Sequence, residues 1–111
     1  MASPAKSTHF ENLSNVGQDV TNGKTHVSKI VVTNASVAPA FVQVFDSAAA
    51  NVVLGTTKPL FTIPCSATAG FTSVNFSHGW LVDFSVSVFS TTTPTGSSGS
   101  APGVFLQAWV S

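Results

Sequence analysis

The chain has 111 residues, the length of one domain, and only eight of them carry a formal charge, against about a quarter of the residues in a typical domain. Four Lys balance four Asp or Glu, so the sequence has no basic stripe that could bind nucleic acid directly. Polar residues interrupt every apolar run well short of the ~20 residues that cross a membrane. A neutral chain that is 43% hydrophobic favours association with partners.

Residues 1–24 differ in pattern from the rest of the chain. Their apolar periodicity is weak, and Met1–Ser14 lacks the apolar core of a secretory signal. We expect residues 1–24 to form an arm that lies on another subunit, or an edge strand with a frayed end. Phe10–Leu13 could supply a short strand there. Residues 25–111 then form a single domain.

The rest of the sequence alternates apolar and polar side chains with the period of two that is typical of strands. The clearest example is Trp80–Phe89, in which every even-numbered residue is apolar. The predicted strands are His26–Thr33, Ala40–Asp46, Leu60–Ile63, Phe71–Phe76, Trp80–Phe89 and Val104–Val110. Turn-forming clusters separate them at Asn34–Pro39, Gly55–Thr57, Ser66–Gly70 and Ser77–Gly79. The pattern predicts an all-β fold, an antiparallel, jelly-roll-like β-sandwich of about 7–8 short strands.

Two segments between the predicted strands lack this alternation. Ser47–Leu54 is expected to be a loop, with room for one helical turn. Thr91–Gly103 consists almost wholly of Thr, Ser, Gly, Pro and Ala and carries no charge. A loop of this length is either a flexible hairpin tip or a contact loop that a neighbouring molecule orders.

Cys65 is the only cysteine of the chain, so an intramolecular disulfide is excluded. The simplest interpretation is a small buried hydrophobe in a protein made in a reducing cytoplasm. An intermolecular disulfide or a reactive thiol is the alternative.

The sequence contains no recognisable catalytic, metal or cofactor motif. It has neither a Gly-x-Ser-x-Gly elbow nor a phosphate-binding glycine loop. The carboxylates and imidazoles are scattered and have no metal-ligand spacing; they are Glu11, Asp19, Asp46, Asp83, His9, His26 and His78. We therefore expect a protein that is not an enzyme and that holds no metal or cofactor.

Large apolar residues on the second face of two predicted strands indicate a contact surface. Val104, Leu106, Ala108 and Val110 can face a core, which leaves Phe105, Gln107 and Trp109 pointing outward. In the central strand, Phe41 and Phe45 lie opposite Val42 and Val44. A sandwich covers only one face of each sheet, so these aromatic residues either contact another subunit or are covered by loops of the same chain. The predicted interface is Phe41, Phe45, Phe105, Gln107 and Trp109.

Several of these segments resemble small β-sandwich virion proteins of tailed bacteriophages. In that family a strand ending in Asn precedes a strand that ends in an aromatic residue and Asp, and a proline-bracketed strand and a Phe-to-Gly segment follow. The corresponding segments here are Ile30–Asn34, Pro39–Asp46, Pro59–Pro64 and Phe76–Gly79. The resemblance covers residues 29–110. The Ser/Gly stretch stands where such chains have an Ala/Asp-rich loop.

The resemblance implies a structural protein of the virion, made in the host cytoplasm, with no catalytic residues. Its most direct form is a head decoration (cement) protein that binds copies of itself and the major capsid protein. A trimer would match local threefold positions of the shell. The alternatives are a tail, neck or fibre component that uses Thr91–Gly103, and a carbohydrate-binding module or small hydrolase in which Trp80 and Trp109 stack on sugar rings.

Overall fold

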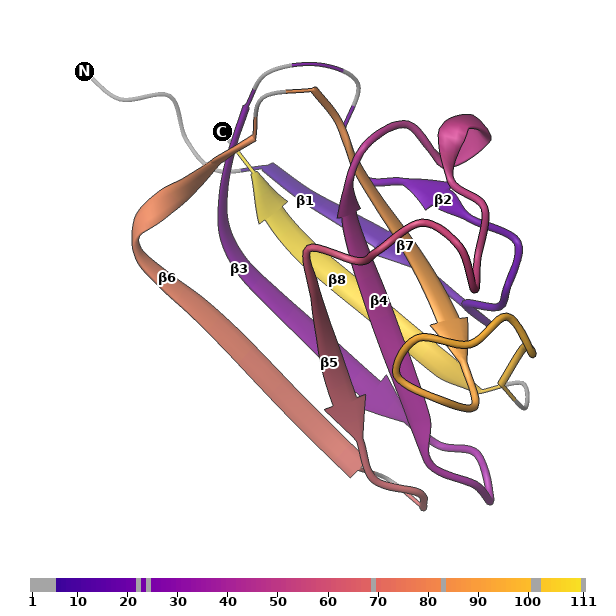
Figure 1. Ribbon diagram of the computed structural model, residues 1–111. Coiled ribbons are helices and arrows are strands. Elements are labelled where there is room, and N and C mark those ends of the chain that lie inside the picture. The colour runs from indigo at the N-terminus through magenta and orange to yellow at the C-terminus, as the bar shows by residue number, and fades with distance from the viewer. Residues whose placement is uncertain are drawn as a thin grey trace.

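The computed structural model describes residues 6–21, 23, 25–68, 70–82, 84–100 and 103–110, with side chains for all of these except residues 6 and 77–81. They form eight strands and one short 3-10 turn, η1, at Ala49–Asn51 (Figure 1). The strands are β1 (Lys6–Phe10), β2 (Gln18–Asp19), β3 (Thr25–Asn34), β4 (Ala40–Asp46), β5 (Phe61–Cys65), β6 (Gly70–Val82), β7 (Val86–Thr91) and β8 (Val104–Val110).

The strands form two antiparallel sheets of four, with the orders β1-β8-β3-β6 and β2-β7-β4-β5, which we call sheet A and sheet B. The ladders are nested: β4 pairs with β5, β3 with β6, β2 with β7 and β1 with β8. The chain is thus one long antiparallel hairpin that is wound into two layers, which is the jelly roll. The predicted all-β sandwich with jelly-roll-like topology is confirmed.

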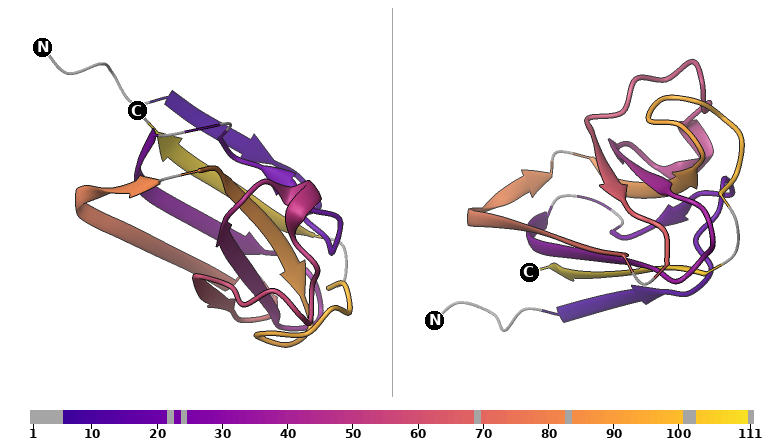
Figure 2. Two further views of the ribbon diagram at one scale, coloured as in Figure 1. Left: turned by 45° about the horizontal axis from the view of Figure 1, so that its top comes forward. Right: turned by 90° about the horizontal axis from the view of Figure 1, so that it is seen from below.

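The core lies between the two sheets, which face each other as two layers (Figure 2). Val and Ile dominate it, because branched side chains pack well on a pleated surface. Its most enclosed members come from the inner faces of the long strands. They include Val27, Ile30, Val32, Val42, Val44, Ile63, Val82, Val86, Val88, Val104, Leu106 and Ala108.

The predicted strand Trp80–Phe89 is not one strand. Trp80 to Val82 end β6 and Val86 begins β7, and the chain reverses between them. The backbone N–H groups of Phe84 and Ser85 donate to Asp46 Oδ1 at 2.9 and 3.2 Å, which holds the bend. Phe84 is 71% exposed although it matches the apolar alternation. The apolar alternation of the sequence therefore continues through a turn, because Phe84 at the bend is itself an apolar residue.

The predicted turn at Ser77–Gly79 is instead an irregularity inside β6. Val27 of β3 lies opposite Trp80, and Lys29 lies opposite Asn75, so residues 76–79 of β6 face Ser28 alone. Extra residues on one strand of a ladder bend that strand. β6 bends sharply along its length (Figure 1). The predicted strand Phe71–Phe76 is the first arm of this longer strand.

Residues 6–21 contribute an edge strand to each sheet, through β1 on sheet A and β2 on sheet B. β1 ends at Phe10, so the strand expected at Phe10–Leu13 lies earlier in the chain, and Leu13 is a buried core residue. β2 has only two residues and was not foreseen. Among the described residues, no helix is long and apolar enough to span a membrane.

Candidate interaction surface

The outer faces of the two sheets differ in what covers them. Loops of the same chain gather over sheet B, whereas no described segment lies over the outer side of sheet A (Figure 2, right). The predicted interface residues are divided between these two faces. Phe41 and Phe45 belong to β4 of sheet B, and Phe105, Gln107 and Trp109 belong to β8 of sheet A.

Phe45 is enclosed by its own chain. Its side chain is 2% exposed, and its ring packs edge-on against Phe89 with centroids 5.4 Å apart. A Cβ at Gly17 would lie 2.3 Å from the Phe89 ring and 2.9 Å from Ala49 Cβ, so the N-terminal segment and the η1 turn close over this pair. Phe45 therefore has no surface to offer a partner, and the chain itself fills the place expected for a neighbouring subunit.

The segment 91–100 is tied to the outer face of sheet B. Gln43 is fully buried, and its Nε2 donates to Thr91 Oγ1 and to the carbonyl of Gly96, each at 2.9 Å. Thr62 Oγ1 donates to the carbonyl of Pro94 at 3.0 Å. These bonds hold the described part of the Thr91–Gly103 loop in place without a neighbouring molecule.

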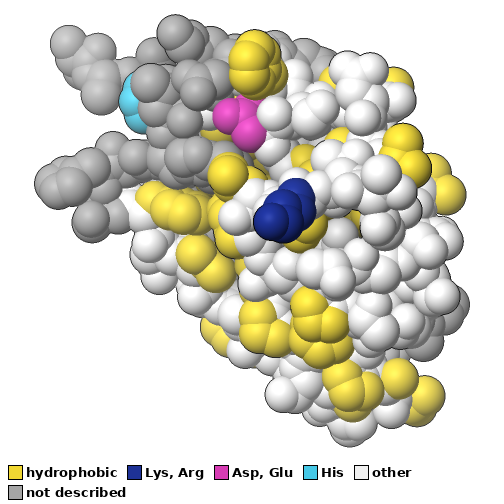
Figure 3. Space-filling model, in the orientation of Figure 1, with side chains coloured by type: hydrophobic (Ala, Val, Ile, Leu, Met, Phe, Trp, Pro, Cys, Tyr) yellow, Lys and Arg dark blue, Asp and Glu magenta, His cyan; other side chains and the backbone are white. Residues whose placement is uncertain are grey.

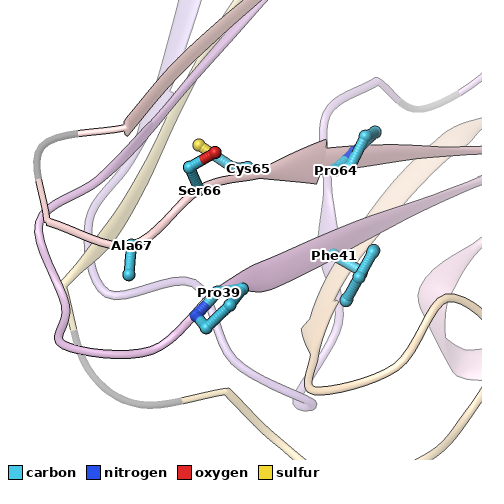
Figure 4. Close-up of a pocket in the computed structure, with 6 residues that line it drawn as sticks. All are labelled: Pro39, Phe41, Pro64, Cys65, Ser66 and Ala67. Carbon is cyan, nitrogen blue, oxygen red and sulfur yellow. The ribbon is translucent and has the colours of Figure 1, made fainter.

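Phe41 is half-buried beside a shallow hollow of about 360 Å³ at one end of sheet B (Figure 4). The hollow is lined by Pro39, Phe41, Pro64, Cys65, Ser66 and Ala67. Its surface is mostly apolar and includes no charged side chain, and Ser66 is its one hydroxyl-bearing residue. The thiol of Cys65 is 97% buried on the core side of β5, within 3.7 Å of the Val32 carbonyl oxygen.

The outer face of sheet A brings Phe105, Gln107 and Trp109 together with side chains of three other strands. The inner residues Val104, Leu106 and Ala108 are at most 1% exposed, so the alternation in β8 is as expected. We use the name sheet A face for the outward residues of this sheet. They are Ser7 and His9 of β1, Phe105, Gln107 and Trp109 of β8, Lys29, Val31 and Thr33 of β3, Phe71, Ser73 and Asn75 of β6, and Glu11 just beyond β1.

Register fixes the neighbours on this face. Gln107 lies between His9 and Val31, and Trp109 lies between Ser7 and Lys29. The ammonium of Lys29 lies 5.4 Å from the centre of the Trp109 ring. A cation over an indole is worth about 0.5–1 kcal/mol at an exposed site, so Lys29 helps to fix the Trp109 ring.

A small groove of about 110 Å³ crosses the sheet A face, lined by His9, Val31, Thr33, Phe105, Leu106 and Gln107. His9 Nε2 and Glu11 Oε1 are 3.5 Å apart beside it, and the Glu11 side chain is 70% exposed. Phe71, at the β6 edge of the same face, is 66% exposed. Apolar and uncharged polar side chains therefore make up most of this face. Gln107 lies near its middle, between His9 and Val31, and the charged Lys29 and Glu11 lie at its sides.

Sequence reasoning missed Val31, Phe71 and the two charged residues of this face. The alternation in His26–Thr33 places Val31 and Thr33 on one side of their strand. Only the strand order shows that this side continues the face of Phe105 and Gln107. That order joins residues far apart in the sequence, so no local signal could reveal it. The side chain of Trp80 and the whole of Asp83 lie outside the part of the chain that is described.

Within the described ranges, no group of three His, Cys, Asp or Glu is placed to hold a metal ion. Asp19 and Asp46 act as backbone caps, because Asp19 Oδ1 accepts from the N–H of Ala49 at 2.8 Å and Asp46 Oδ1 from the turn before β7. Charged side chains appear only as isolated patches among hydrophobic and uncharged polar ones (Figure 3). Among the described residues, the sheet A face is therefore the candidate interaction surface.

No protein-family model and no curated protein matches the sequence. A solved structure with some likeness is the coat protein of Tobacco streak virus, with a TM-score of 0.45 and 11% sequence identity. The match covers 100% of this chain and 88% of the coat protein chain. At this level of similarity, the fold class rests on the strand order of the chain itself, and the resemblance to tailed-phage proteins stays a proposal.

Proposed function

We propose that this protein is a non-enzymatic structural component of a virus particle, and specifically a decoration (cement) protein of a tailed-phage head. It binds copies of itself through the sheet A face, and it also binds the major capsid protein. The observation that carries the proposal is the outer face of sheet A, over which no described segment lies: Phe105, Val31 and Trp109 are partly exposed there and Phe71 is 66% exposed, whereas loops of the chain gather over sheet B. Exposed apolar surface of this kind marks interaction sites.

The proposed mechanism is mechanical. The sheet A face is built on four hydrogen-bonded strands and so needs little ordering on binding, which lowers the entropic cost of association. Repeated attachment over a shell lattice makes weak individual contacts effective. The sequence resemblance to phage virion proteins supports a role in a virus particle, and the scarcity of charged residues supports association with partner molecules.

Trp109→Lys tests the contact face. The substitution places a second ammonium beside Lys29 on the sheet A face, so we expect self-association to weaken more than tenfold, whereas the free energy of unfolding falls by only about 1 kcal/mol. Sedimentation velocity measures the first quantity and urea denaturation the second.

Val53→Lys is the matched control for this experiment. Val53 is 60% exposed in the segment between η1 and β5, outside the sheet A face, so the same charge is added away from the proposed contact. This variant should associate like the wild type. Normal assembly of the Trp109→Lys variant would show that the sheet A face is not the contact surface.

Imaging of particles that contain the chain tests its place in the virion. Density on the faces of the head shell supports a cement protein. Density at the tail, neck or fibre alone contradicts it and favours the corresponding tail component. Binding of the purified chain to a glycan array would instead point to a carbohydrate-binding module.

A further inference from the structure

The two charged groups of the sheet A face lie on opposite sides of Gln107. Lys29 lies one strand away from Gln107, in the row of Trp109. Glu11 follows the end of β1, which neighbours β8 on the side away from β3. Along the strands it lies beyond His9, so it is displaced from Gln107 in the direction opposite to Lys29. From strand spacing and rise, the two residues are roughly 17 Å apart on the sheet. They are therefore too far apart to neutralise each other within one molecule.

This placement is self-complementary. Two copies that pack face to face about a twofold axis contact each other through the same surface, and residue i of one meets residue j of the other in both directions. A twofold axis that lies in the plane of the contact, passes over Gln107 and is perpendicular to the line from Lys29 to Glu11 puts each ammonium opposite the other copy's carboxylate. The apolar residues between these charges are covered at the same time.

We propose that the occupant of the sheet A face is a second copy of this chain, in a twofold pair centred on Gln107, with Lys29 of each copy opposite Glu11 of the other. This inference rests on the proposed function, because it names the partner of the same face. The opposite charges fix the register of the pair, and Trp109, Phe105 and Val31 supply its apolar contact.

The size of the face predicts that this pair is weak. Four strands at 4.8 Å and about six residues at 3.3 Å each give roughly 400 Å² per copy. A stable interface buries about 800 Å² per partner. We therefore expect dissociation in the micromolar range or above for free molecules, with lattice attachment supplying the remaining affinity.

Charge reversal in two separately prepared variants tests the pairing. In Lys29→Glu alone, two carboxylates face each other across both halves of the contact, and in Glu11→Lys alone two ammonium groups do. Each variant should self-associate about tenfold more weakly than the wild type, since surface ion pairs are worth up to about 1 kcal/mol each. Mixed in equal amounts, they should form a heterodimer of wild-type affinity, because both contacts are then opposite in charge.

Lys58→Glu is the matched control. Lys58 is exposed in the loop before β5, outside the sheet A face, and its reversal changes the net charge by the same amount. Lys58→Glu should associate like the wild type, and its heterodimer with Glu11→Lys, which has one opposite-charge and one like-charge contact, should stay weaker than the wild-type pair. Analytical ultracentrifugation of fluorescently labelled variants measures both the single proteins and the mixtures.

The outcomes separate this inference from the function on which it rests. Suppose that Trp109→Lys abolishes association but the mixture of Lys29→Glu and Glu11→Lys binds no more tightly than either variant alone. The sheet A face is then the contact surface, and the twofold register is wrong. A wild-type chain that binds the shell but stays monomeric up to about 1 mM overturns the paired occupant alone. If Trp109→Lys assembles normally, both proposals fail.

Discussion

Asn34 connects the end of β3 to two other parts of the fold. Its side chain is fully buried, and Oδ1 accepts from the N–H and the hydroxyl of Ser36 at 3.0 and 2.6 Å. Its Nδ2 donates to the carbonyls of Ala38 at 2.9 Å and Cys65 at 3.4 Å. One side chain thus closes the β3–β4 turn and anchors it to the end of β5.

Asn34→Ala should lower the free energy of unfolding by about 3 kcal/mol, because it leaves several buried backbone groups without partners. Urea denaturation measures the loss. Asn75→Ala is the control, since Asn75 is exposed, and it should change stability by less than about 0.5 kcal/mol. Equal effects of the two substitutions would mean that the turn does not depend on the Asn34 side chain.

At the scale of elements, the long loop after β7 depends on β4. Thr92 N–H donates to the carbonyl of Ser98 at 2.9 Å and gives the loop a pairing of its own, while Gln43 connects it to the sheet. Among the described residues, Gln43 Oε1 is buried without a hydrogen-bond partner, so the Nε2 donor makes both observed bonds of this amide. Loss of that donor should release the loop and leave the two sheets intact.

Gln43→Glu should destabilise the fold by about 3 kcal/mol, because a carboxylate would be buried against the Gly96 carbonyl oxygen. Gln43→Met, of similar shape but uncharged, should cost about 1 kcal/mol. Hydrogen exchange should show faster exchange at Thr92 in both variants and little change in β8. Unchanged protection of Thr92 in the Glu variant would contradict the role given to Gln43.

The sequence predicted strands best where the residues of a strand and the turn-forming residues beside it indicate the same boundaries. Ala40–Asp46 and Val104–Val110 match β4 and β8, because turn-forming residues precede them and each is apolar on both faces apart from one Gln and the Asp that ends β4. β6 and β7 were misdivided, since Phe84 continues the alternation through a bend that Asp46, distant in sequence, holds in place. Local pattern cannot report a cap that comes from another strand.

The candidate surface was predictable only in part, for the same reason. Alternation in β8 correctly placed Phe105, Gln107 and Trp109 outward, because it requires no knowledge of neighbouring strands. Whether an outward aromatic residue is free or covered depends on loops packed over the sheet. Phe45 is covered by Phe89 and the N-terminal segment, and no feature of its own strand indicates this.

At the scale of the whole molecule, the effect of low charge on solubility can be measured separately from specific association through the sheet A face. The chain has no net charge, which permits non-specific precipitation through any surface. The double variant Val37→Lys/Val53→Lys adds two charges at side chains that are 91% and 60% exposed, off the sheet A face. Its saturation concentration in a polyethylene glycol titration should rise several-fold.

The dissociation constant for self-association of this double variant should stay within about twofold of the wild type, because the changes are remote from the contact. Sedimentation equilibrium checks this value. If solubility and affinity changed together, association would be a general effect of low charge and not the property of one face.

The nested ladders also set an order of folding. β4 and β5 are closest in sequence, and each further pair encloses the one before it, until β1 joins β8 across residues 11–103. Closing a longer loop costs more entropy before its contacts form, so we expect slow folding that proceeds outward from the β4–β5 hairpin. β1 should join last and open first. Each such opening exposes the backbone edge of β8, so a free molecule is briefly most prone to aggregate beside the surface that carries Trp109.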